Sequence, residues 1–153
     1  MRSSARSGCY ARGVARAPAA AAPAAGPVIY GTGVDLLHIS RMAKVYERHP
    51  QRLVQRMLHP LERARFDEAR DPVNFLAKSF AVKEAFVKAL GTGFRGIAHD
   101  DVGWTRAPLG PPQLCVSPRA AAMLAARGIA AMHLSLSDEV DLVCAVVTLE
   151  RQR

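Results

Sequence analysis

The sequence predicts an α+β domain in which a small, mostly antiparallel sheet packs on one long helix. An apolar helical stretch covers residues 72–90, strict alternation marks "AAMHLSLSDEV" (residues 130–140), and "DLVCAVVTLE" follows as a nearly continuous apolar strand. The 153 residues, 50% hydrophobic and 22% charged, suit one globular domain. No apolar run approaches the roughly 18 residues that span a bilayer, so we expect no membrane segment.

The first 27 residues differ from the rest of the chain. They carry four Arg and no acidic residue, and so hold half of the formal net charge of +8. Their Ala-, Arg-, Ser- and Pro-rich composition predicts disorder, whether as a functionless tail or as a start site assigned too early. The composition also suits an organelle targeting segment, which we favour less. The folded domain is expected over residues 28–153.

The first half of the domain is expected to be mainly helical. A strand over residues 27–37 contains Gly31 and Gly33, and short helices follow around residues 39–49, 51–58 and 61–70. Asp71 then predicts an N-cap for the long helix, with Pro72 in its first turn. Gly91 or Gly93 would end that helix in a left-handed conformation.

The second half is expected to supply most of the sheet. "DVGWTRAP" and "PQLCVS" predict two strands around a Pro-Gly-rich turn, and a helix capped by Ser117 follows. In the alternating stretch, Met132, Leu134 and Leu136 share one face, and His133 lies on the other. We expect a tight turn at Asp138-Glu139 before the last strand.

Four residues are candidates for chemistry. Glu84 and Lys88 lie one turn apart on a largely apolar helix, so they form either a surface ion pair or part of a site. Asp35 ends the first strand and is either a capping residue or a hard oxygen ligand suited to Mg²⁺. A lone His such as His133 is more often structural.

Three motifs together resemble the holo-acyl-carrier-protein synthase family, the small 4′-phosphopantetheinyl transferases. They are "GTGVDLLHISRM", "FLAKSFAVKEAFVKALGTGFRG" and "MHLSLSDE", in the family's order and spacing, and the resemblance covers residues 28–151. It implies the phosphopantetheinyl transferase fold. It also implies transfer of the phosphopantetheine arm of coenzyme A to a serine of apo-acyl carrier protein, in support of fatty acid biosynthesis, with release of adenosine 3′,5′-bisphosphate.

The resemblance also assigns roles to residues. Asp35 and Glu84 match the family's Mg²⁺-binding carboxylates, and Lys88 matches its phosphate-contacting lysine. The turn Gly91-Thr92-Gly93 matches the nucleotide-phosphate loop, and His133 the histidine on the coenzyme A side. The serine proton would pass to Glu84 or to a water that Glu84 orients.

The resemblance further implies partners for the chain. Family members are typically trimers with active sites between subunits. Their Arg-rich early helix grips the acidic carrier protein, and Arg41, Arg48 and Arg52 are the candidates here. The three cysteines show no CxxC spacing, which indicates a reducing compartment, and we expect a cytoplasmic enzyme.

One position departs from the family's pattern. The family usually carries Arg before the Phe of "FAxKEA", whereas this chain has Ser79. A basic contact to coenzyme A is then either lost or supplied by Lys78. Lys83 points about 100° away from Glu84 around the helix, so it is a candidate for contacting a different phosphate.

Two other functions stay open at this point. A basic nucleic-acid-binding module would fit the net charge, but the folded part is only about +4 and has no recognisable binding signature or base-stacking platform around Trp104. A non-catalytic homologue is suggested by Ser79. We favour the transferase and expect no nucleic-acid or membrane partner.

Overall fold

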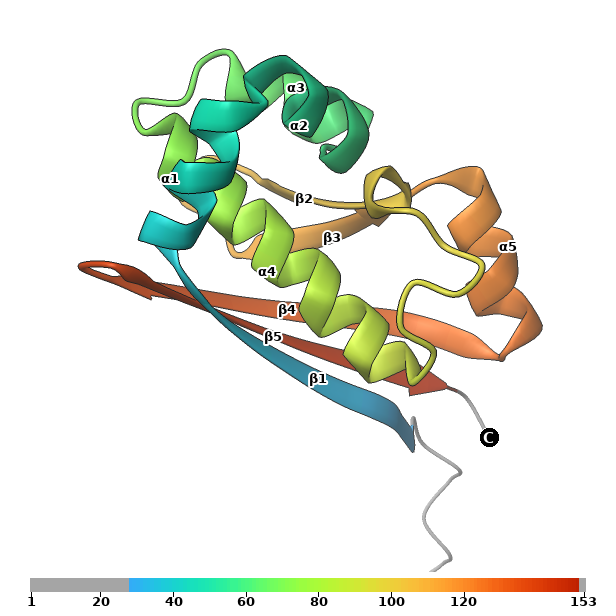
Figure 1. Ribbon diagram of the computed structural model, residues 1–153. Helices are drawn as coiled ribbons and strands as arrows, with labels where there is room; N and C mark the ends of the chain where they lie inside the picture. Colours follow the sequence, from blue (N-terminus) through green and yellow to red (C-terminus); the bar gives the residue numbers. More distant parts are fainter. Residues whose placement is uncertain (1–27, 152–153) are drawn as a thin grey trace, which may run out of the picture.

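The computed structural model describes residues 28–151 and confirms the predicted α+β class (Figure 1). The expected tail, residues 1–27, lies outside the described residues. The elements in chain order are β1 (Val28–His38), α1 (Ile39–Arg48), α2 (Pro50–Met57), α3 (Pro60–Phe66), α4 (Pro72–Leu90), the 3₁₀ helix η1 (His99–Asp101), β2 (Val102–Arg106), β3 (Pro112–Val116), α5 (Pro118–Ala126), β4 (Ile129–Glu139) and β5 (Leu142–Arg151).

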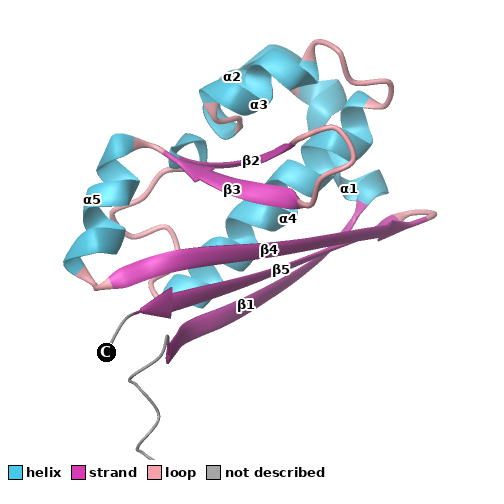
Figure 2. Ribbon diagram, turned by 180° about the vertical axis from the view of Figure 1, so that it is seen from behind, coloured by secondary structure: helices cyan, strands magenta, loops and turns pink. Residues whose placement is uncertain are grey.

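The strands form two separate antiparallel sheets. One has three strands in the order β1-β5-β4, and the other is the β2–β3 hairpin. Figure 2 shows the hairpin beside the larger sheet, with α4 on the far side of both. One face of the larger sheet is therefore covered by α4, and the opposite face carries no element within the described residues.

The long helix α4 is the centre of the domain. As predicted, the Asp71 side chain caps its first turn by accepting a hydrogen bond from the Asn74 backbone N–H at 2.9 Å, and Gly91 ends it with a φ of 77°. Twelve of its 19 residues are buried, and they lie on all sides of the helix. No helix among the described residues is long and apolar enough to cross a membrane.

Two glycines let α4 lie directly on β1. A Cβ atom at Gly31 would lie 2.1 Å from the carbonyl oxygen of Ala89, and one at Gly33 would lie 2.0 Å from that of Ala85. The backbones of strand and helix therefore touch, with only small side chains between them. Because side chains alternate along a strand, Asp35 faces α4 on the same side as these glycines.

The last hairpin turns two residues later than the sequence predicted. Asp138 and Glu139 pair with Val143 and Leu142, and the turn is Val140-Asp141, with Val140 at a φ of 45°. Asp138 is held in the strand because Lys78 and Asn74 of α4 bind its carboxylate. These contacts extend the pairing past the expected turn, so that prediction was wrong.

We expect Gly33→Ala to destabilise the fold by about 2 kcal/mol or more, because the added methyl group would overlap backbone atoms that have no room to move. Urea denaturation of the variant and the wild-type protein measures the difference. Thr32→Ala is the matched control, because Thr32 is exposed on the other face of the same strand. Equal midpoints for Gly33→Ala and wild type would contradict the close contact.

Candidate active site

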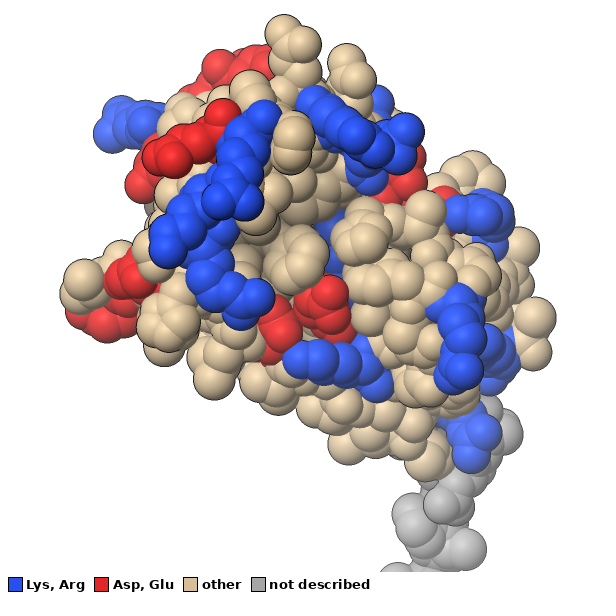
Figure 3. Space-filling view, in the orientation of Figure 1, with Lys and Arg blue, Asp and Glu red and all other residues tan. Residues whose placement is uncertain are grey.

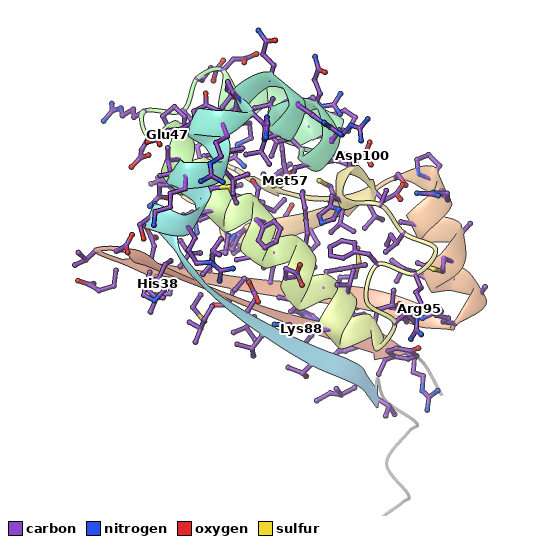
Figure 4. All side chains as sticks on the ribbon, in the orientation of Figure 1. His38, Glu47, Met57, Lys88, Arg95 and Asp100 are labelled. Carbon is purple, nitrogen blue, oxygen red and sulfur yellow. The ribbon has the colours of Figure 1, made fainter. Side chains whose placement is uncertain are left out.

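Asp35 and Lys88 meet at the contact between β1 and α4. The Lys88 Nζ atom donates to Asp35 Oδ1 at 2.8 Å and to the carbonyl oxygen of Val34 at 3.0 Å. The Asp35 side chain is 13% exposed and that of Lys88 50% exposed. Figure 4 shows Lys88 reaching from α4 towards β1. Residues 53 positions apart in the sequence are thus joined by an ion pair at the surface.

Glu84 lies one helical turn before Lys88 and belongs to the same cluster. Burial raises the pKa of its carboxyl group, and the negative charge of Asp35 raises it further, while Lys88 opposes the shift. Two carboxylates therefore repel one another here, and a cation between them would relieve that repulsion.

The donor atoms of this cluster suit Mg²⁺. Among residues 28–151 no group of three or more His, Cys, Asp and Glu side chains could hold a metal ion by itself. Mg²⁺ characteristically takes one or two carboxylates from the protein and completes its shell with water and substrate phosphates. Asp35 and Glu84 provide two hard oxygen ligands on neighbouring elements, so the residues fit this ion.

The turn after α4 lies next to Lys88 in the chain. Gly91 and Gly93 have φ angles of 77° and 57°, which Ala or a larger residue adopts only with strain. The Thr92 carbonyl accepts a hydrogen bond from Arg95 Nε at 3.1 Å. Gly91 and Gly93 are exposed, and the turn follows Lys88 by three residues, so an anion bound there is the arrangement that the resemblance predicts.

A family model described as "4'-phosphopantetheinyl transferase superfamily" matches residues 31–146, a range that contains the whole cluster. The chain belongs to this superfamily. A holo-[acyl-carrier-protein] synthase from Nitratidesulfovibrio vulgaris is 48% identical over 124 residues, which are 80% of this chain and 99% of that protein.

Solved structures of such transferases have the same fold. The crystal structure of a holo-[acyl-carrier-protein] synthase from Neisseria meningitidis has a TM-score of 0.78 and 40% identity, covering 81% of this chain and 100% of that one. One from Helicobacter pylori, in complex with coenzyme A, has a TM-score of 0.68 and 26% identity, covering 77% of this chain and 98% of that one.

In this transferase chain, His133 lies on the opposite face of the sheet from Asp35. It pairs with Thr148, which in turn pairs with Thr32, so the three side chains lie on one face of the sheet. Thr32 lies between Gly31 and Gly33, which face α4, so this is the face turned away from α4. Its Nε2 lies 3.2 Å from Glu150 Oε2, beside a separate pocket of about 440 Å³ between β3 and β4. A single chain does not bring His133 to the other site residues.

Lys83 and Lys78 both form ion pairs in this structure. Lys83 is fully buried, with its Nζ atom 2.5 Å from Glu62 Oε2, so it is not free to contact a phosphate in this structure, and that expectation is wrong for the single chain. Lys78 lies 2.9 Å from Asp138. It precedes Glu84 by six residues, which places it about 240° around the helix.

Ser79 has a role inside the domain. It is fully buried, and its Oγ accepts a hydrogen bond from Trp104 Nε1 at 3.1 Å. A buried indole N–H needs such a partner. Ser79 thus connects α4 to β2, and the departure from the family's pattern has a local structural reason.

A groove between α1, α2 and α4 lies next to the site. Its volume is about 390 Å³; it is lined by Leu37, Arg41, Met42, Val45, His49, Arg52, Leu53, Arg56, Met57, Phe80 and His99. Figure 3 shows basic side chains over α1 and α2, with a small acidic group below them on the same face. Of the three arginines expected to bind a partner, Arg41 and Arg52 line this groove, whereas Arg48 does not.

Sequence reasoning missed three features around the site. Arg56 joins the groove, and Glu62 is the buried partner of Lys83. The His99 ring stacks on Phe94 with ring centres 3.9 Å apart, and lies 6.1 Å from Phe80. In the sequence, the apolar neighbours of Lys83 indicated that a buried ammonium group would need an acidic partner. The spacing of residues did not identify Glu62 as that partner.

Proposed function

We propose that this chain transfers the 4′-phosphopantetheine group of coenzyme A to a serine hydroxyl of apo-acyl carrier protein, in the cytoplasm and in support of fatty acid biosynthesis. One observation carries the proposal. Asp35, Glu84 and Lys88, from two distant motifs of a superfamily member, meet in one cluster beside a glycine-rich turn. Relatives that are holo-[acyl-carrier-protein] synthases, matched over 80–81% of this chain, support the choice of substrates.

The residues of the cluster suit this reaction. The serine oxygen forms a bond to the β-phosphorus of coenzyme A, the bond to the leaving phosphate breaks, and adenosine 3′,5′-bisphosphate departs. Mg²⁺ held by Asp35 and Glu84 would neutralise the pyrophosphate oxygens. Lys88 adds positive charge where negative charge develops. Glu84, whose pKa is raised, accepts the serine proton either directly or through a water that it orients.

We expect Asp35→Asn and Glu84→Gln each to reduce transfer by at least about 100-fold, because each removes a charged ligand from the site. Mass spectrometry of an apo-acyl carrier protein, incubated with coenzyme A, Mg²⁺ and the enzyme, measures the gain of the phosphopantetheine mass. Asp67→Asn is the control, since Asp67 is an exposed acid at the end of α3.

Each alternative predicts a different result. Full transfer by Asp35→Asn or Glu84→Gln would reject the proposed metal site. No transfer by the wild-type protein would favour a non-catalytic homologue. Absence of coenzyme A binding together with a salt-sensitive shift of DNA would favour the nucleic-acid-binding module.

The groove is the proposed docking site of the carrier protein. Apolar side chains of α1 and α2 line it, and Arg41, Arg52 and Arg56 add positive charge to the same lining. An acidic partner would be attracted by these charges and would bury apolar groups between them. Arg48 lies on the same helix as Arg41 and is proposed to contribute only to long-range attraction.

We expect Arg41→Glu and Arg52→Glu each to raise the KM for the carrier protein about tenfold or more, with little change in kcat, because they reverse a charge at the docking site. Steady-state kinetics at two salt concentrations measure this, and the effect should shrink at high salt. Arg127→Glu, at the residue that caps the C-terminus of α5, is the control for the change in net charge. An unchanged KM in both groove variants would exclude this surface.

The proposed trimer has a candidate interface on the uncovered face of the larger sheet. Val34 is 48% exposed and Leu36 59% exposed on that face, which also carries His133. Burying these side chains against another subunit would remove apolar surface from water. It would also place His133 near a neighbouring chain, where the resemblance expects it to act.

We expect the wild-type protein to sediment as a trimer and Leu36→Glu to sediment as a monomer, because a charge on the buried face would lose its hydration. Analytical ultracentrifugation measures both. Leu61→Glu serves as the control, since Leu61 is an equally exposed apolar residue on α3. A monomeric wild-type protein would contradict the proposed assembly.

A further inference from the structure

Glu62 and Lys83 form an ion pair inside the domain. Both side chains are 0% exposed, and the Lys83 Nζ atom lies 2.5 Å from Glu62 Oε2. Lys83 also donates to the carbonyl oxygen of Val102. Glu62 accepts hydrogen bonds from the backbone N–H of His59 at 2.9 Å and of Trp104 at 3.3 Å. The pair therefore joins α4 to both α3 and β2.

Stability alone does not explain this pair. Removing two charges from water costs several kcal/mol per ion, and apolar residues of similar size often replace a buried ion pair without loss of stability. The domain already has an extensive apolar core around α4. The pair is explained better by its ability to fix the orientation of the elements that it joins than by the stability that it adds.

In the central part of the long helix, Ala81 to Val87, the directional side-chain contacts are those of Lys83. This segment is buried except at Glu84, so apolar packing surrounds it on most sides. Hydrophobic burial is not directional and distinguishes poorly between small rotations of such a helix about its axis. A rotation of about 10° would move a side-chain end at the helix surface by roughly 1 Å.

Glu84 lies between two fixed points of α4. Lys83, the preceding residue, is anchored to Glu62 and Val102, while Ala85, the following residue, rests on Gly33 of β1. We propose that the Glu62–Lys83 pair sets the rotation of α4 and thereby aims Glu84 at Asp35. Glu62 and Lys83 are thus positioning residues, and this inference rests on the transfer activity proposed above.

The double variant Glu62→Leu/Lys83→Met tests the proposal. It replaces the pair with apolar side chains of similar size, so we expect its urea midpoint to stay near that of the wild type. Its kcat for transfer should fall at least about tenfold, because a displacement near 1 Å at a reacting group can cost up to about 100-fold. Its KM for the carrier protein should stay within about twofold, since the groove on α1 and α2 is left intact.

Arg65→Met is the matched control. Arg65 lies on α3, as Glu62 does, and binds the carbonyl oxygen of Trp104 from outside, but it makes no ion pair with α4. We expect its kcat to equal that of the wild type. If the double variant does not fold, Glu62→Gln/Lys83→Met takes its place with the same expected fall in kcat, because it removes both charges and keeps the shape of the Glu62 side chain.

The outcomes separate the two proposals. Wild-type protein without transfer activity would refute the proposed function. Active wild-type protein together with a stable double variant of unchanged kcat would refute the positioning role alone. An equal fall in kcat in Arg65→Met would also refute it, because loss of any contact around β2 would then have the same effect.

Discussion

The contact between the backbones of α4 and β1 is the constraint on which the rest of the structure depends. Gly31 and Gly33 leave no room for a side chain against Ala85 and Ala89, so the helix lies as close to the strand as the atoms allow. A longer side chain at either glycine would separate the elements that carry Asp35 and Lys88. The motif "GTGVD" therefore combines a contact surface with the carboxylate that is proposed to bind the metal ion.

Electrostatics then determine what this contact can do. Asp35 and Glu84 are held close enough for the charge of one to raise the pKa of the other, and the ammonium group of Lys88 offsets only part of that effect. Lys88 is half-exposed on a flexible stem, so its Nζ atom can turn from Asp35 to a phosphate at small cost. The two carboxylates of the cluster can thus attract a cation while the ammonium group of Lys88 attracts an anion.

Local rules were sufficient to predict most of the elements and part of the site. The caps at Asp71 and Gly91 are interactions between near neighbours in the chain. The strands were also predictable, because the alternation of apolar and polar residues is a local pattern. The late turn at Val140 and the burial of Lys83 depend on partners far along the chain, which no window of sequence contains. Asp35 was assigned to the site through motif resemblance, because residue spacing alone could not predict that β1 lies against α4.

The two faces of the larger sheet explain why one chain holds only part of the expected site. Alternation along the strands sends Asp35 towards α4 and His133 away from it, and no rotation of a side chain can reverse that. If both act on one substrate, His133 must come from another subunit. Burial of the exposed apolar side chains of Val34 and Leu36, which is proposed above for a trimer, would then complete the site as well as stabilise the assembly.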